Sequence, residues 1–358
     1  MHSIFRINDV KPMQGNEEVY EVELSLTSDN DEELRVLTEQ IRKESFPDAE
    51  GWKRLGLVFS NIGQLDIAEQ ICRVTLNEKF AGCLQADTYN QLGIIKYHQG
   101  QHEDAIILYQ KALEIQQQSL PSNHPDVASS YGNIGNVYRN MGDYSRALSS
   151  HEQALNIRQQ SLPSNHPDVA KSYNNIGAVY WDMGDYSRAL SSYEQALNIR
   201  QQSLPSNHPD VASSYNNIGN VYTNMGDYSR ALSSHEQALN IRQQSLPSNH
   251  PDVASSYNNI GAVYSNMGDY SRALSSHEQA LHIRQQSLPS NHPDVAKSYN
   301  NIGAVYSHMG DYPNACLFYE YALQIGQQVL PSTHSHLQLY KRNVEETQHI
   351  LTVLGFLK

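Results

Sequence analysis

The sequence predicts an all-α solenoid of about seven helical hairpins and a capping helix, preceded by a short β segment. Histidines recur every 42 residues, at His124, His166, His208, His250, His292 and His334. A Met-Gly-Asp-Tyr turn keeps the same spacing, beginning at Met141, Met183, Met225, Met267 and Met309. Between these marks each period carries two stretches of helical apolar spacing. A fixed period of this length is typical of stacked units that pack only on their neighbours.

Residues 1–46 precede the repeats. Residues 3–7 (SIFRI) are interpreted as a strand, and residues 19–27 alternate between apolar and polar side chains, so two strands are expected within residues 1–30. Residues 31–46 are expected to link these strands to the repeats through a helix over 31–45. Ser28 to Asn30 offer N-cap side chains, and Asp31 to Glu33 place negative charge at the positive helix end.

The repeats occupy residues 47–334. In the central copy one helix is predicted over 168–183 and a second over 186–204. Pro167 suits a first helical position, Gly184 ends the first helix and Pro205 stops the second. Each first helix should place large apolar residues inside, and each hairpin should bring small residues together where its helices approach. The central copy supplies Tyr173, Ile176, Gly177, Tyr180, Ala189, Tyr193 and Ala196 at these positions.

The C-terminal segment, residues 335–358, should cap the array, because a terminal repeat needs a polar outer face. One helix is predicted over 335–354. Leu337, Tyr340, Val344 and Leu351 are expected to face inward. The expected outer face carries Gln338, Lys341, Arg342, Glu345 and Glu346.

The order of residues in the central copy resembles the tetratricopeptide pattern. The 42-residue length, the YNNIGAVY core and the LPSNHPDVA linker are most similar to the variant found in kinesin light chains. The resemblance covers roughly residues 47–354. It implies a right-handed superhelix in which the first helices line a concave groove that binds a partner protein. The heptad segment that joins kinesin light chains to their heavy chain is missing here, which disfavours a motor-subunit role.

The copies differ from one another along one stripe of the first helix. In the copies that begin at Ala128, Ala170, Ala212 and Ala254, the differing positions follow offsets of three, four, three and one. We expect this stripe to read ligand side chains in the groove; the alternative is an exposed surface that drifts freely. The candidate residues are Arg139, Lys171, Trp181, Asp182 and Lys297.

One asparagine of the first helix does not vary between copies. It stands at Asn133, Asn175, Asn217, Asn259 and Asn301. Its carboxamide can donate and accept a hydrogen bond at once, which suits a peptide backbone. In kinesin-light-chain-like arrays, such a ladder holds an extended peptide, so the resemblance implies the same role here. The alternative is a hydrogen bond between helices that only sets the geometry of the repeats.

Other features point away from catalysis and metal binding. The six periodic histidines are one per repeat, too far apart to share a metal, and are expected to cap loops. Arg158, Arg200, Arg242 and Arg284 lie near second-helix ends and are expected to stay solvated. The sequence contains no GxSxG, P-loop or HExxH motif. We therefore expect no cofactor.

Composition narrows the class of protein further. The formal net charge of −13 disfavours a general nucleic-acid binder. The mean hydropathy of −0.59 and the lack of an 18-residue apolar run predict no membrane span. Three cysteines without a paired pattern, and no secretory leader, predict a cytoplasmic protein. The leading hypothesis is a non-enzymatic scaffold that binds a protein or peptide. The sequence does not reveal the identity of this partner or the oligomeric state of the scaffold.

The first 30 residues suggest a second hypothesis. MHSIFRI followed by YEVELSLTSDND resembles the last strands of arginine-specific mono-ADP-ribosyltransferase domains. The resemblance implies a fragment of an NAD-dependent transferase fused to the array. The catalytic Glu-x-Glu of that family precedes this segment, so it would lie upstream of Met1. Glu21-Val22-Glu23 follows the first strand and is not expected to be catalytic. A kinesin-light-chain-like cargo adaptor is the third hypothesis.

Overall fold

The computed structural model describes residues 4–12, 20–27, 56, 59–60, 63–77 and 82–356. The protein forms two compact units, residues 1–120 and 121–358, and each is described by itself. The predicted helix over 31–45 and most of the first helix of the first repeat lie outside the described residues. The described part contains two strands followed by fourteen helices, which confirms a helical repeat array.

Two strands lie in the N-terminal segment. β1 (Ile4–Pro12) and β2 (Tyr20–Thr27) pair in antiparallel fashion, with Ile4 opposite Thr27 and Pro12 opposite Tyr20. The register shifts between Ile7 and Asp9. These strands form a two-stranded sheet.

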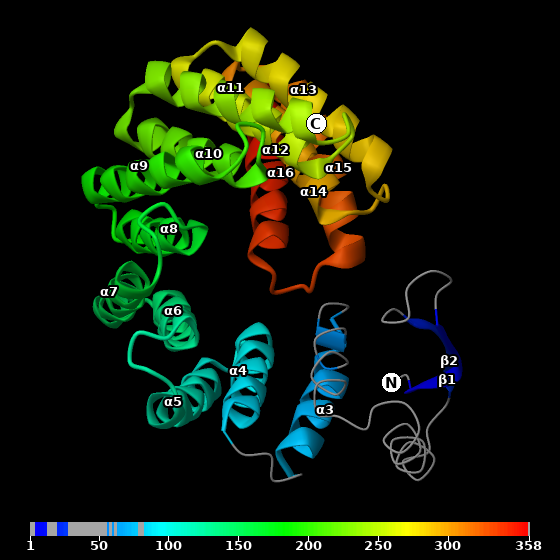
Figure 1. The fold of residues 1–358 in the computed structure, drawn as a ribbon. Coiled ribbons are helices and arrows are strands. Elements are labelled where there is room, and N and C mark those ends of the chain that lie inside the picture. The colour runs from blue at the N-terminus through cyan, green and yellow to red at the C-terminus, as the bar shows by residue number, and fades with distance from the viewer. Residues whose placement is uncertain are drawn as a thin grey trace. The chain divides into compact units, whose positions relative to one another are not determined.

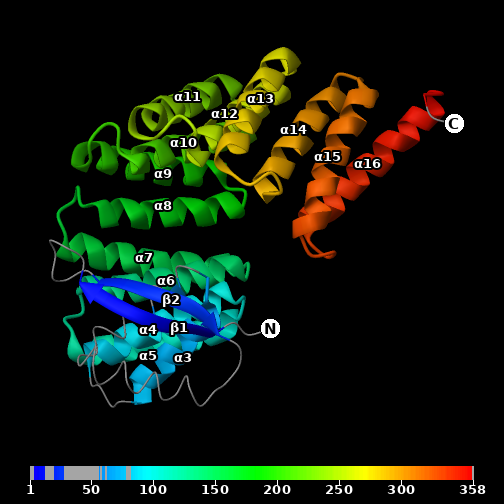
Figure 2. The same cartoon turned by 90° about the vertical axis from the view of Figure 1, so that its right-hand side faces the viewer.

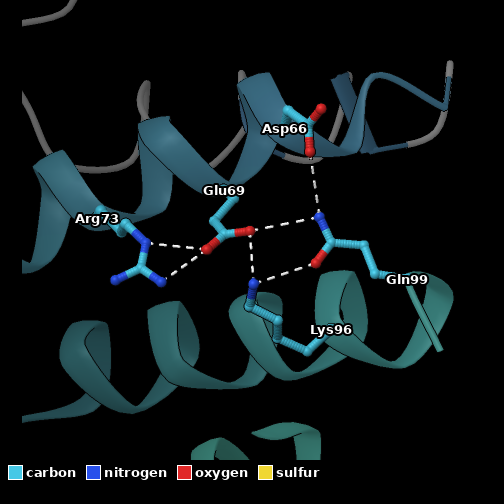
Figure 3. A network of polar contacts seen from close by, with 5 residues as sticks. All are labelled: Asp66, Glu69, Arg73, Lys96 and Gln99. Carbon is cyan, nitrogen blue, oxygen red and sulfur yellow. Dashed lines mark hydrogen bonds and ion pairs between the residues drawn. The ribbon is translucent and has the colours of Figure 1, made fainter. Parts of the chain in front are cut away.

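The first unit also contains α3 (Leu65–Asn77), α4 (Cys83–His98) and α5 (His102–Ser119). Figure 3 shows the polar network that joins α3 to α4. The Glu69 carboxylate accepts hydrogen bonds from Arg73 (2.7 Å) on its own helix and from Lys96 Nζ (2.8 Å) on α4. Burial alone would raise the pKa of Glu69, but the hydrogen bonds from Lys96 and Arg73 outweigh it and lower that pKa. Glu69 therefore stays ionised and ties the two helices together.

The second unit consists of five hairpins and a final helix. In Figure 2, α7, α8 and α9 lie one above another as nearly parallel layers. Helix boundaries agree with the predicted ones to within one or two residues in the central copy. The helices are α6 (Pro125–Asn140), α7 (Tyr144–Ser161), α8 (Pro167–Asp182), α9 (Tyr186–Ser203), α10 (Pro209–Met225), α11 (Tyr228–Ser245), α12 (Pro251–Met267), α13 (Tyr270–Ser287), α14 (Pro293–His308), α15 (Tyr312–Val329) and α16 (Ser335–Val353).

The periodic histidine is the N-cap of each first helix. His208 precedes Pro209, and its Nδ1 accepts a hydrogen bond from the Asp210 backbone N–H (3.1 Å). This bond satisfies one of the amides that a helix start leaves without a partner. The same bond recurs at His124, His166, His250, His292 and His334. The expected capping role of the histidines is confirmed.

The turn inside each hairpin is equally regular. Gly226 has a φ of 77°, a left-handed conformation that glycine adopts without a steric penalty. Asp227 then caps the second helix, because its Oδ1 accepts the Arg230 backbone N–H (3.1 Å). The Arg230 guanidinium lies over the Tyr222 ring, 4.4 Å from its centroid. The turn therefore ends one helix and starts the next with local interactions alone.

Within a hairpin, a glycine of the first helix faces a ring of the second. A Cβ at Gly177 would lie 2.9 Å from the Tyr193 ring, and one at Gly219 would lie 2.7 Å from His235. Alanines complete the close approach, and Ala189 and Ala231 are fully buried. Small residues thus stand where the backbones approach and large rings fill the adjoining space, as the sequence predicts.

The arginines near the second-helix ends are buried, and the expectation that they stay solvated is wrong. Arg200 on α9 is 8% exposed. Its Nη1 donates to Ser214 Oγ (2.7 Å) and to the Asp210 carbonyl (3.1 Å), both on α10. Burial lowers the pKa of Arg200, which still carries its charge. The same arginine-to-serine bond, at 2.7 Å, joins Arg158 to Ser172, Arg242 to Ser256 and Arg284 to Ser298.

The last junction replaces this polar pair with an apolar one. Gly326 and Tyr340 stand 42 residues after Arg284 and Ser298, and a Cβ at Gly326 would lie 3.1 Å from the Tyr340 ring. Leu337, Tyr340, Val344 and Leu351 of α16 are buried, as predicted. Glu345 replaces the glycine that each earlier first helix of this unit presents to its hairpin partner. α16 therefore packs on α15. It carries the exposed, polar Glu345 at the position where each earlier first helix contacts the ring of its second helix.

Candidate functional site

The candidate site lies on the first helices of the second unit. In Figure 1 the second helices α7, α9, α11 and α13 lie on the outer side of the row, and the first helices lie inside it. α6 contacts α8 and α10 contacts α12, so first helices of adjacent repeats are neighbours. On α8 the variable stripe runs through Lys171, Asn174, Ala178, Trp181 and Asp182. Lys171 and Asp182 are exposed and the other three are half-buried.

The asparagines of the ladder form hydrogen bonds from one repeat to the next. Asn217 Nδ2 donates to Asn174 Oδ1, one repeat earlier, at 3.0 Å. The same bond joins Asn259 to Asn216 (2.7 Å), Asn301 to Asn258 (2.7 Å) and Asn343 to Asn300 (2.8 Å). We call each of these bonds a rung. A rung uses one of the two N–H groups of the donor carboxamide, and the half-buried side chain retains the capacity to donate once more and to accept.

The α6/α8 junction has a different connection. Residue 132 is glycine, whereas the equivalent residues of the other copies are Asn174, Asn216 and Asn258. Asn175 therefore has no asparagine opposite it. Two turns further along both helices, Arg139 Nε contacts Asp182 Oδ2 at 2.5 Å. An ion pair therefore joins the two helices where the rung is missing.

The remaining candidates are distributed over the same face. Trp181 packs edge-on against Tyr186, with ring centroids 5.4 Å apart, and contributes to the core around Tyr193 and Ile218. Lys171 on α8 and Lys297 on α14 are exposed. Asn133, the first of the ladder, is half-buried on α6. The structure thus brings Arg139 to Asp182 and leaves Lys297 three repeats away from Lys171.

Three buried histidines lie behind this face. His151, His235 and His277 are 1–3% exposed, and Nδ1 of each has no hydrogen-bond partner among the described residues. Burial, assisted by the charge of Arg242, lowers the pKa of His235 to about 4. The pKa of His151 and of His277 is likewise lowered to about 4, chiefly by burial. These rings are therefore neutral at pH 7 and pack as apolar groups. Within the described residues, no group of histidine, cysteine or acidic side chains could hold a metal ion.

Sequence reasoning misses the residues that accept the rungs. It treats Asn174 and its equivalents only as one position of the variable stripe, and it does not place Asn343 of α16 in the ladder. Both signals are present in the sequence. Asn343 stands 42 residues after Asn301. Among the four copies compared, only the first has a residue other than asparagine at the acceptor position, namely Gly132.

These stacked hairpins, each pairing a glycine-bearing first helix with a ring-bearing second, define a helical-repeat solenoid. The model of the tetratricopeptide repeat family matches in overlapping stretches, residues 84–160, 133–202, 168–244, 210–286 and 252–328. The matches together cover more than half of the sequence. The chain belongs to the tetratricopeptide repeat family.

Solved structures of other proteins share the fold. BtubC (BKLC) from P. vanneervenii is 26% identical, with a TM-score of 0.57, and the match covers 65% of this chain and 93% of that one. The nearly identical TPR-like repeats of a putative kinesin light chain from Podosopora anserina are 25% identical, with a TM-score of 0.51, over 58% of this chain and 99% of that one. A tetratricopeptide repeat protein from Parabacteroides merdae, at 17% identity, has a TM-score of 0.56 over 84% of this chain and 98% of that one.

No curated protein matches the sequence. Among the described helices, none combines the length and the apolar character that crossing a membrane requires.

Proposed function

We propose that the protein is a cytoplasmic protein-interaction scaffold whose first-helix face in the second unit binds an extended segment of a partner protein. Tetratricopeptide repeats commonly bind proteins, and the similarity to kinesin-light-chain-like repeats supports this assignment. The observation that carries it is the row of half-buried carboxamides on α8, α10, α12 and α14, repeated every 42 residues.

The geometry of this row suits an extended peptide. Helices in contact are about 8–10 Å apart, and an extended peptide advances about 3.3 Å per residue. Each repeat therefore spans about three ligand residues. The N–H and Oδ1 that a rung leaves available on Asn217 and Asn259 can pair with the backbone carbonyl and N–H of such a ligand. The flanking stripe, including Arg139, Lys171, Trp181, Asp182 and Lys297, supplies side chains that differ between repeats and so can select a sequence.

The experiment begins with a randomised 12-residue peptide library displayed against the purified full-length protein. Selected peptides are resynthesised with fluorescein and titrated by fluorescence polarisation. The double variant Asn217→Ala/Asn259→Ala should weaken binding about fivefold for each lost contact, because a hydrogen bond contributes about 1 kcal/mol. Circular dichroism must show that the variant remains helical.

The repeats offer a matched control for this experiment. Asn198 and Asn240 also recur 42 residues apart, but they lie on the second helices, where each accepts a hydrogen bond from a glutamine of the same helix. Asn198→Ala/Asn240→Ala should bind the peptides as the unmodified protein does. Equal affinity of both double variants would refute the ladder as a binding surface.

The similarity to the putative kinesin light chain favours a cargo-adaptor role as a second candidate. Co-precipitation with the coiled coil of a kinesin heavy chain tests it: binding would support the adaptor role, and a lack of binding would oppose it. The family match begins at residue 84 and lends no support to the transferase resemblance of residues 1–30.

A further inference from the structure

The α6/α8 junction differs from the four later junctions of the second unit in the way its first helices are joined. Those four junctions each have a rung between two asparagines, with donor–acceptor distances of 2.7–3.0 Å. At α6/α8 the acceptor position is Gly132, and the donor position is Asn175. The donor is therefore present without the acceptor that its equivalents use.

The missing side chain leaves room. A Cβ added at Gly132 would meet no atom within 4 Å, unlike one at Gly135, which would lie 2.8 Å from the His151 ring. Gly132 lies in the middle of a helix, where glycine is about 0.5–1 kcal/mol less favourable than alanine. Packing against the rest of the fold does not account for the glycine.

The connection that the rung would supply is present elsewhere in the same junction. Arg139 and Asp182 lie seven residues beyond Gly132 and Asn175, and their ion pair joins the same two helices. The equivalent pairs at the next three junctions are Trp181 and Asn224, Thr223 and Asn266, and Ser265 and His308, and none of them combines two opposite charges. The ion pair can therefore hold the junction together while the rung position stays open.

The variable stripe beside the gap carries one unpaired positive charge. Lys171 lies one turn before Asn175 on α8, is exposed, and has no ion-pair partner within the described residues. Its equivalents on α6 and α10 are Ser129 and Ser213. Arg139 and Asp182 neutralise each other, so Lys171 is the one uncompensated charge of the described stripe over α6, α8 and α10. An anionic group is the complementary ligand.

We propose that the gap between Gly132 and Asn175 is an anchoring subsite for an acidic side chain of the bound peptide. The ligand carboxylate takes the place of the missing asparagine oxygen, accepts a hydrogen bond from Asn175 Nδ2, and pairs with Lys171. This inference rests on the proposed peptide-binding function. It predicts a single acidic residue at a constant position in the peptides that the protein selects.

The test uses the fluorescein-labelled peptides from the 12-residue library described above. Gly132→Asn restores the residue of the other copies and closes the rung to Asn175, so the variant should fold and its thermal midpoint should not fall. Its affinity for the peptides should drop at least tenfold. Replacing the acidic residue of the peptide with alanine should lower affinity for the unmodified protein by a similar factor and leave affinity for Gly132→Asn unchanged.

The lysines provide a matched pair of controls. Lys171→Ser should lower affinity about fivefold or more, with an effect that shrinks at high salt. Lys297→Ser alters the equivalent lysine beside an intact rung, so it should lower affinity by a smaller factor than Lys171→Ser, and by the same factor whether or not the peptide carries its acidic residue. If peptides bind but Gly132→Asn binds them as tightly as the unmodified protein, the subsite is refuted and the proposed function stands. If the library yields no binder, both fail.

Discussion

Arg242 donates a hydrogen bond from Nη1 to Ser256 Oγ at 2.7 Å across the boundary between two hairpins. Further along the sequence, residues at the equivalent positions of the last boundary are Gly326 and Tyr340. Both partners change together: the long cation and small hydroxyl become a residue without a side chain and a large ring. The two pairs therefore fill the same space by different chemistry.

This exchange predicts a strong energetic coupling. Arg242→Gly leaves a void beside Ser256, and Ser256→Tyr places a ring against the Arg242 guanidinium, so each single change should cost about 2–4 kcal/mol. The double variant recreates the terminal pair and should recover at least about 1 kcal/mol of the summed loss. Chemical denaturation of the four proteins in a double-mutant cycle measures the coupling. Additive losses would show that the two pairs are not interchangeable.

The buried histidines predict loss of stability on acidification. In the unfolded protein, histidine binds its proton near pH 6.5, whereas His151, His235 and His277 do so only at about pH 4 when folded. Their contribution is therefore complete above pH 6.5 and is lost as the pH falls from 6.5 towards 4. The slope is about 1.4 kcal/mol per pH unit for each histidine.

Tyr193 occupies the same position in the intervening hairpin and provides the control substitution. The triple variant His151→Tyr/His235→Tyr/His277→Tyr should lose less stability between pH 7.5 and pH 4.5 than the unmodified protein. Thermal midpoints at both pH values measure the difference. An equal decrease in the two proteins would assign the acid sensitivity to other groups.

Two glycines of the first helices should respond oppositely to alanine. A Cβ at Gly219 would lie 2.7 Å from His235, so Gly219→Ala should lower the unfolding free energy by about 1–3 kcal/mol. A Cβ at Gly132 meets nothing within 4 Å, so Gly132→Ala should raise it by about 0.5–1 kcal/mol. Denaturant titration compares them. Destabilisation by Gly132→Ala would contradict the open space at that position.

The histidine caps should be replaceable only by other capping residues. His250 Nδ1 accepts the Asp252 backbone N–H at 3.1 Å. His250→Ala removes this acceptor and should cost about 1 kcal/mol, whereas His250→Asn retains a side-chain acceptor and should cost only a few tenths. Hydrogen exchange of the first amides of α12 detects the change. Equal protection in the two variants would exclude the cap as the cause.

The architecture could be predicted because its signals are local and repeated. The histidine cap, the glycine of left-handed φ and the spacing of Tyr173, Ile176 and Tyr180 each act within one helix or turn. The partners of polar residues could not be predicted, because they lie on neighbouring repeats. The serine that holds Arg200 is Ser214, in the next hairpin. A position that is identical in every copy also gives no indication whether it contacts a ligand or the adjacent repeat, as the carboxamide of Asn217 illustrates.

The boundary pairs determine how the length of this protein can change. Each middle hairpin has the serine on its first helix and the arginine near the end of its second helix. Any such hairpin can follow any other, because the arginine of one always meets the serine of the next. The arginines are Arg158, Arg200, Arg242 and Arg284. Middle hairpins can therefore be gained or lost without creating a mismatched boundary. The Gly326–Tyr340 pair does not match the arginine–serine pairs, so whatever number of hairpins precedes it, α15 and α16 must stay next to each other.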